Sequence, residues 1–179
     1  NITPSNFNIS TLQSYLDNAS ESKKIIINFA SGKYSITHTL FVHSNTKINL
    51  ADKNTTLVRS GEALISNLIR NSEFGVNTSS IAMQSHKGKY DLSHDITING
   101  NGGTFDGGNV KAAANGCNLI NIGHASGITI KNASFKNCFD GHLIELAGVK
   151  DSSITGCKFD GTTSRFTATG DEESDDEDH

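Results

Sequence analysis

Short segments of alternating apolar and polar residues run through most of the chain. In each segment every second residue is apolar, which is typical of a strand with one buried face. Gly, Asn, Asp and Ser separate the segments, and these residues tolerate tight turns and positive φ angles. Helical periodicity is absent after the first twenty or so residues. The pattern therefore predicts an all-β fold built from many short strands.

A 24-residue repeat organises the later part of the chain. The segment 118–141, NLINIGHASGITIKNASFKNCFDG, aligns without a gap on the segment 142–165, HLIELAGVKDSSITGCKFDGTTSR. The aligned pairs are Leu119 with Leu143, Ile120 with Ile144, Ile122 with Leu146, Ile130 with Ile154, Ala133 with Cys157 and Phe135 with Phe159. Short strands at this period, without helices for βαβ crossovers, indicate a solenoid. We predict a single-stranded right-handed parallel β-helix of about 24 residues per turn, with about five to six turns.

Like residues on successive turns of such a solenoid form ladders along its axis. The segment 95–107, DITINGNGGTFDG, repeats the Ile-x-Ile…Phe theme with two extra residues before the Phe. An aromatic ladder is therefore expected from Phe105, Phe135 and Phe159. The residues that follow these three are Asp106, Lys136 and Asp160. They should form a ladder of alternating charge on a solvated face, where single pairs contribute little energy.

The chain divides into a cap, a repeat region and an acidic segment. Residues 1–22 are expected to be an N-terminal capping segment with a helix over 8–18, because apolar residues recur there at helical spacing after Ser10 and Thr11. Such a helix would cover the apolar core and the strand edges of the first turn. Turns should follow over 23–166, with insertions at 71–94 and 107–117 that wall a groove. Residues 167–179 are expected to be a disordered tail or a truncated loop.

The net charge of −4 arises from the end of the chain. The last nine residues carry seven acidic side chains, and the remainder has 15 basic against 12 acidic residues. No basic stripe is present, which argues against nucleic-acid binding, and the longest apolar run is too short to span a membrane. The acidic residues could supply Ca²⁺ ligands, but the EF-hand spacing is missing. No C-terminal cap is visible, so we expect a fragment of a longer β-helix whose open end self-associates.

Three cysteines, Cys117, Cys138 and Cys157, are an odd number without a CxxC pair. This count excludes a complete disulfide framework and argues against a zinc knuckle. We expect these cysteines to be small buried side chains in the stacked core.

The predicted helix is followed in order by the segments IIINFASGKYSIT, LFVHSNTKINLADKNTTLVR and HDITINGNGGTFDG. This order resembles the pectate-lyase-like superfamily. The nearest branch is the polygalacturonase-related one of bacterial surface and phage proteins, and the resemblance extends from Leu12 to Phe159. It implies a right-handed parallel β-helix, a polysaccharide partner and an extracellular or cell-surface location. Members of the superfamily include lyases, glycoside hydrolases, tailspikes and adhesins, so the fold alone does not decide the function.

The catalytic motifs of the polygalacturonase-like enzymes are absent from this sequence. Those enzymes carry Asn-Thr-Asp, Asp-Asp and Gly-His-Gly on successive turns, whereas Gly141, His142 and Leu143 match only the first two residues of the last motif. A lyase would need Ca²⁺ on clustered carboxylates and a Lys or Arg base. The candidate acids are Asp106, Asp140, Glu145 and Asp160, and the candidate bases are Lys131, Lys136, Lys150 and Arg165. Two hypotheses stay open: a segment of a carbohydrate-active enzyme, inactive alone and needing no cofactor itself, or a non-catalytic adhesin or tailspike-type glycan-binding module.

Asn121 and Glu145 occupy the same position in the repeat, between inward-facing aliphatic residues, and should point outward together. An amide beside a carboxylate suits sugar hydroxyls, although it equally suits a plain exposed strand. His124, Asp140 and His142 lie near the predicted strand boundaries. The predicted substrate-binding residues are Asn121, His124, Lys136, Asp140, His142 and Glu145. Catalytic residues are not assigned, and no metal ligand is predicted.

Overall fold

The computed structural model describes residues 1–61, 67–71, 88–110, 118–139 and 141–163 of the 179-residue chain. It contains one helix, α1 (Ile9–Leu16), within these ranges. The strands are β1 (Ile25–Phe29), β2 (Gly32–Ile36), β3 (Leu40–Val42), β4 (Thr46–Leu50), β5 (Thr55–Arg59), β6 (Ile69–Asn71), β7 (Ser93–His94), β8 (Thr97–Asn99), β9 (Thr104–Asp106), β10 (Ile120–Ser126), β11 (Thr129–Lys131), β12 (Ser134–Phe139), β13 (Ile144–Lys150), β14 (Ser153–Thr155) and β15 (Lys158–Thr163). The chain is thus predominantly β, as predicted.

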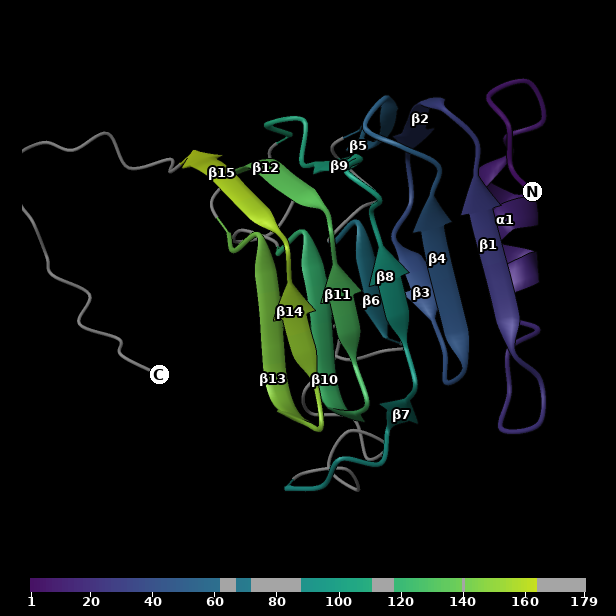
Figure 1. The fold of residues 1–179 in the computed structure, drawn as a ribbon, viewed down its shortest axis with the longest axis vertical. Coiled ribbons are helices and arrows are strands. Elements are labelled where there is room, and N and C mark those ends of the chain that lie inside the picture. The colour runs from purple at the N-terminus through teal and green to yellow at the C-terminus, as the bar shows by residue number, and fades with distance from the viewer. Residues whose placement is uncertain (62–66, 72–87, 111–117, 140, 164–179) are drawn as a thin grey trace, which may run out of the picture.

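The strands form three parallel sheets. Sheet 1 has the order β1-β4-β8-β11-β14, sheet 2 has β2-β5-β9-β12-β15, and sheet 3 has β3-β6-β10-β13 with β7 beside β10. The chain adds one strand to each sheet and then returns to sheet 1, and one such pass is called a rung here. Figure 1 shows α1 at one end of the stack and β13, β14 and β15 at the other. This arrangement is consistent with a parallel β-helix.

The strand register confirms the 24-residue repeat. Ile120 pairs with Ile144 in sheet 3, Ile130 with Ile154 in sheet 1, and Phe135 with Phe159 in sheet 2. In each of the three sheets, residues that align in the sequence repeat therefore lie beside each other in consecutive rungs.

Phenylalanine rings stack on the core-facing side of sheet 2. The ring centroids of Phe105 and Phe135 are 5.2 Å apart, and those of Phe135 and Phe159 are 5.7 Å apart, with nearly parallel planes in both pairs. Phe105 and Phe135 are fully buried, whereas Phe159 is 53% exposed because it lies in the last strand of the sheet. The predicted aromatic ladder is confirmed.

Left-handed residues stack at the corner that leads into sheet 1. Asn45, Asp95 and Asp151 have φ angles of 62°, 54° and 51°, and Gly127 has a φ of 67°. Backbone hydrogen bonds link each of these corners to the next rung, as from the Asp95 amide to the Ser126 carbonyl. Asn, Asp and Gly adopt this conformation more readily than other residues, which explains their recurrence between the strands.

The cap differs in detail from the prediction. Helix α1 spans Ile9–Leu16 instead of 8–18, and the side chain of Asn8 caps it by accepting a hydrogen bond from the Thr11 backbone N–H at 2.9 Å. Leu12 and Leu16 are buried against the first rung, whereas Tyr15 is 50% exposed. The apolar face of the helix is therefore narrower than the sequence spacing indicates.

Several predicted features fall outside the described residues. These are most of the insertion 71–94, the second half of the insertion 107–117, the acidic segment 167–179, Cys117, Asp140 and Arg165. Of the other cysteines, Cys138 is fully buried and Cys157 is partly buried, and both are free thiols. Among the described residues, no helix is long and apolar enough to cross a membrane.

Candidate functional site

Four residues form a row across the outer face of sheet 3. Phe41 in β3 pairs with Arg70 in β6, which pairs with Asn121 in β10, and Asn121 pairs with Glu145 in β13. The preceding residue in each strand, Leu40, Ile69, Ile120 and Ile144, belongs to the hydrophobic core or packs against it. Since side chains alternate between the two faces of a strand, the row points away from the core. We call these four residues, together with Asn118 and His142, the sheet 3 row.

Arg70 lies over the ring of Phe41. Its guanidinium carbon is 4.8 Å from the centre of the Phe41 ring, a cation–π geometry. Its Nη1 lies 3.4 Å from the Asn67 Oδ1, and the Asn67 side-chain Nδ2 donates to the Asn118 backbone carbonyl at 2.6 Å. Arg70 is only 6% exposed although it lies outside the core. These contacts hold a buried cation next to Asn121.

Asn118 joins His142 to Glu145. Its Oδ1 accepts a hydrogen bond from the His142 amide at 2.8 Å and lies 3.0 Å from the His142 Nδ1. Its Nδ2 donates to the Glu145 Oε2. A single asparagine therefore positions both the histidine and the carboxylate on the rim of the row.

Asn121 carries a buried acceptor of the row. The residue is 8% exposed, and its Oδ1 has no hydrogen-bond donor within the described part of the chain. A buried acceptor without a donor costs about 1–3 kcal/mol. The sequence correctly places Asn121 on the outer face beside Glu145. The side chain is nevertheless buried, and Arg70 and Glu145 flank it on both sides.

The structure brings together three of the six predicted binding residues: Asn121, His142 and Glu145. His124 lies three residues beyond Asn121, at a bend of β10 where its φ is 50°, and its Nδ1 is 3.3 Å from the Lys89 carbonyl. Its neighbour in the next rung is Gly148, which has a φ of 65°, so this position is a recurring left-handed bend. Lys136 lies on sheet 2, and Asp140 is outside the described residues.

The predicted charge ladder is present on sheet 2. Lys136 pairs in register with Asp106 on one side and with Asp160 on the other. The Lys136 Nζ is 3.7 Å from the Asp106 Oδ2, and the Asn137 side-chain Nδ2 donates to the Asp106 Oδ1 at 2.9 Å. Lys131 lies in sheet 1, and Lys150 lies 5.5 Å from the Tyr90 ring centre at the end of β13. The described candidates for lyase chemistry are thus spread over three sheets.

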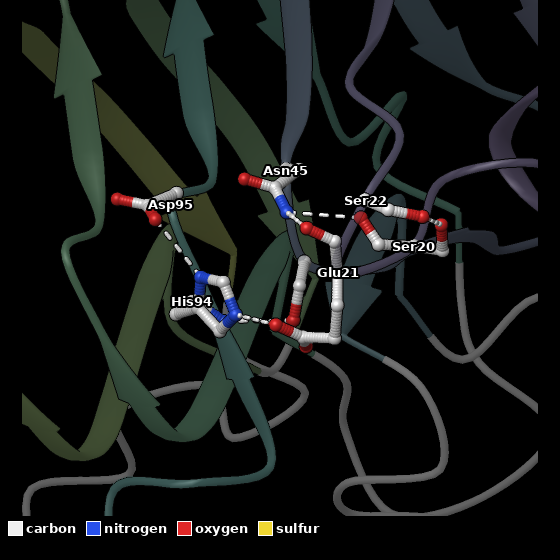
Figure 2. Close-up of polar contacts among 7 residues, drawn as sticks. Ser20, Glu21, Ser22, Asn45, His94 and Asp95 are labelled. Carbon is white, nitrogen blue, oxygen red and sulfur yellow. Dashed lines mark hydrogen bonds and ion pairs between the residues drawn. The ribbon is translucent and has the colours of Figure 1, made fainter.

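A second polar cluster joins the capping segment to the sheets. Figure 2 shows the His94 ring between Glu21 and Asp95, with the Glu21 Oε2 at 2.7 Å from Nε2 and the Asp95 Oδ2 at 2.9 Å from Nδ1. Asn45 donates to the Ser20 carbonyl at 2.9 Å in the same region. A neutral imidazole can donate through only one nitrogen, so this geometry favours the imidazolium. The hydrogen bond to Asp95, followed by that to Glu21, raises the pKa of His94 above its usual value.

We call the second cluster the tie at His94. Glu21 and Asp95 have exposed side chains, and His94 is partly exposed. The described residues contain no group of three or more His, Cys, Asp or Glu side chains that could hold a metal ion. The sequence did not reveal this cluster, because Glu21 and His94 are 73 residues apart and lie in no repeat.

Comparisons with known proteins support the fold. No protein-family model and no curated protein matches the chain. Among solved structures, the chain is similar to ORF18 of Geobacillus virus E2, with a TM-score of 0.55 and 13% sequence identity. The match covers 86% of this chain and 33% of that chain, so this chain spans a third of that protein's length. At this identity the likeness shows the fold alone, and that fold is β-helix-like.

Proposed function

We propose that this chain is a right-handed parallel β-helix of the pectate-lyase-like kind that binds polysaccharide along the sheet 3 row. The observation that carries the proposal is the buried Oδ1 of Asn121, which has no donor among the described residues. A sugar hydroxyl is a suitable donor, because it can satisfy this acceptor and accept a hydrogen bond from a neighbouring group at the same time.

The chemistry of the row suits a glycan. Glu145 and Asn118 supply a carboxylate and an amide beside Asn121, and Arg70 supplies a cation on its other side. The row crosses neighbouring strands, which are about 4.8 Å apart, so successive sugars of an extended glycan can contact successive rungs. An extracellular or cell-surface location, bacterial or phage, belongs to the same proposal.

Binding without cleavage is the form of the function that we favour for this segment. Glycoside hydrolysis uses a pair of carboxylates on opposite sides of the scissile bond. Within the described residues of the row, Glu145 is the one carboxylate. A lyase or glycoside hydrolase as the parent protein rests on the resemblance alone, and an adhesin or tailspike-type module agrees better with this row.

A glycan array and a depolymerisation assay, each run with and without Ca²⁺, test the proposal. Wild-type protein should bind one class of polysaccharide and release no fragments. Asn121→Leu and Glu145→Gln should each weaken that binding by about tenfold or more. The first removes a polar partner of the sugar, and the second replaces a charged acceptor with a neutral amide. Thr129→Ala, on the outer face of sheet 1, is the matched control and should bind like the wild type.

Two outcomes contradict the proposal. Unchanged binding by both row variants would place the glycan elsewhere. Release of oligosaccharides by the wild-type chain would show that this segment is catalytic, and dependence of that release on Ca²⁺ would favour a lyase.

A further inference from the structure

The two ends of the stack differ in how far their strand edges and core side chains are covered. At the N-terminal end, Ile2 forms a β-bridge with Phe29 along the edge of sheet 1, and the side chain of Gln13 bonds to the backbone of Phe41 at the edge of sheet 3. Leu12 and Leu16 of α1 are buried in the same core as the first rung. At the other end, β13, β14 and β15 are the last strands of the three sheets in the described part of the chain.

The last rung exposes apolar side chains that belong to core columns. Ile154 is 40% exposed and Phe159 is 53% exposed, whereas their partners Ile130 and Phe135 in the preceding rung are completely buried. The outer edges of these strands also carry backbone N–H and C=O groups that a further strand can bond. Exposed apolar area beside an open strand edge is a surface that favours a partner strand.

We propose that this surface is the docking site for a second copy of the chain, with β15 of one copy antiparallel to β15 of the other. The two-fold axis would pass beside Phe159, so the two Phe159 rings would meet and extend the stack that Phe105 and Phe135 begin. The same rotation sets β13 of each copy beside β14 of the other. This proposal concerns assembly and goes beyond the glycan-binding proposal.

Charge complementarity selects a second copy as the occupant. Antiparallel pairing centred on Phe159 places Lys158 of each copy opposite Asp160 of the other. The ladder of Asp106, Lys136 and Asp160 would then continue with Lys158 of the second copy, so the alternation of charge would persist across the interface. Opposite charges directly across from each other stabilise a strand pair, and like charges destabilise it.

The alternative occupants fit less well. Residues 171–179 of the same chain carry seven acidic side chains and no apolar side chain, and residues 164–170 offer two apolar side chains, Phe166 and Ala168, to cover Ile154 and Phe159. Docking against the N-terminal end of another copy would meet the covered edges of Ile2 and Gln13. A symmetric pair of C-terminal ends closes on itself, so the proposed assembly is a dimer and not a filament.

A charge-swap series tests the dimer on the full chain. Size-exclusion chromatography with light scattering should show a dimer of wild-type protein at about 100 µM. Lys158→Asp and Asp160→Lys should each weaken dimerisation by about tenfold or more, because each sets two pairs of like charges across the interface. The double variant restores opposite charges and should recover the dimer. Ser22→Asp, at the covered end, is the charge control and should leave the dimer intact.

Circular dichroism and thermal unfolding of each variant separate a lost interface from a lost fold. A monomeric wild-type chain at the same concentration overturns the proposal. If the amides of β15 are nevertheless protected from hydrogen exchange in that monomer, residues 164–179 are the occupant. A dimer that survives both single variants would place the interface elsewhere and also overturns the proposal.

Discussion

Gln13 takes the place of a neighbouring strand for Phe41. The Phe41 amide donates to the Gln13 Oε1 at 2.9 Å, and the Gln13 Nε2 donates to the Phe41 carbonyl at 3.0 Å. A primary amide presents the same donor and acceptor as a peptide group, so one side chain satisfies the free edge of β3. The helical cap thus closes sheet 3 through hydrogen bonds as well as through its apolar face.

Gln13→Glu should therefore destabilise the protein by about 1–2 kcal/mol, because the carboxylate cannot donate to the Phe41 carbonyl. The new charge also lies near Asp17, to which the Gln13 Nε2 donates at 2.7 Å. Urea unfolding measures the loss. Ser14→Glu is the matched control, since it adds the same charge to the next, exposed residue of α1. Equal effects of the two variants would show that charge on the helix, and not the edge contact, is responsible.

Substitutions in the phenylalanine ladder should lower the free energy of unfolding most where the ring lies in the interior of the stack. Phe135→Ala removes a completely buried ring between two others and should lower the free energy of unfolding by about 3–5 kcal/mol. Phe159→Ala should cost about 1–2 kcal/mol, because half of that side chain is already in solvent. Both values should be measured at low protein concentration, where dimerisation does not contribute. A Phe159→Ala loss as large as that of Phe135→Ala would contradict the exposure of the last rung.

Asn121→Leu should increase stability while it weakens glycan binding. Leucine has a similar shape and removes a buried acceptor that lacks a donor, so we expect a gain of about 1 kcal/mol. Asn118→Leu is the matched comparison and should cost about 2 kcal/mol, because Asn118 bonds to both His142 and Glu145. Thermal unfolding distinguishes the two variants. Destabilisation by Asn121→Leu would mean that this amide serves the fold instead of a ligand.

The tie at His94 should make stability depend on pH. The folded-state pKa of His94 is raised above 6.5, so its contribution is fully present below about pH 6.5 and is lost as the pH rises through the folded-state pKa. The melting temperature should therefore fall by a few degrees at most between about pH 5.5 and pH 8.5, because both carboxylates are exposed and the pairs are screened.

His94→Gln should reduce this pH dependence. His38→Gln is the control, because His38 is exposed and contacts the Thr37 hydroxyl at 3.1 Å instead of a carboxylate. If both variants keep the wild-type pH profile, another group controls it, and the tie at His94 contributes nothing measurable.

Much of the architecture follows from the repeat, because one rung predicts the neighbours of the next. The pairs Ile120 with Ile144 and Phe135 with Phe159 could be read from the sequence for this reason. The outward direction of Asn121 was also predictable from alternation. Its burial was not, since that depends on Arg70, which aligns with it across an insertion that breaks the period.

Contacts that occur once leave no periodic signal. Gln13 and Phe41 are 28 residues apart, and Glu21 and His94 are 73 residues apart, and each pair joins the cap to a rung. Polar residues in a capping segment have many plausible partners until the fold fixes which rung lies beside them. Among the predicted binding residues that the structure describes, Lys136 lies on sheet 2, away from the others. Nearness to a strand boundary does not predict which of the three sheets a residue joins.

Ile69 and Ile120 are direct neighbours in sheet 3 although 51 residues separate them, whereas Ile120 and Ile144 need only 24. The two strands therefore keep the register of one column although the chain between them is longer than one repeat. Each rung advances the molecule by one strand spacing, about 4.8 Å. Evolution can consequently lengthen such a protein in fixed steps, by one rung at a time, and the distance along the chain between two rungs can vary without a change in their register.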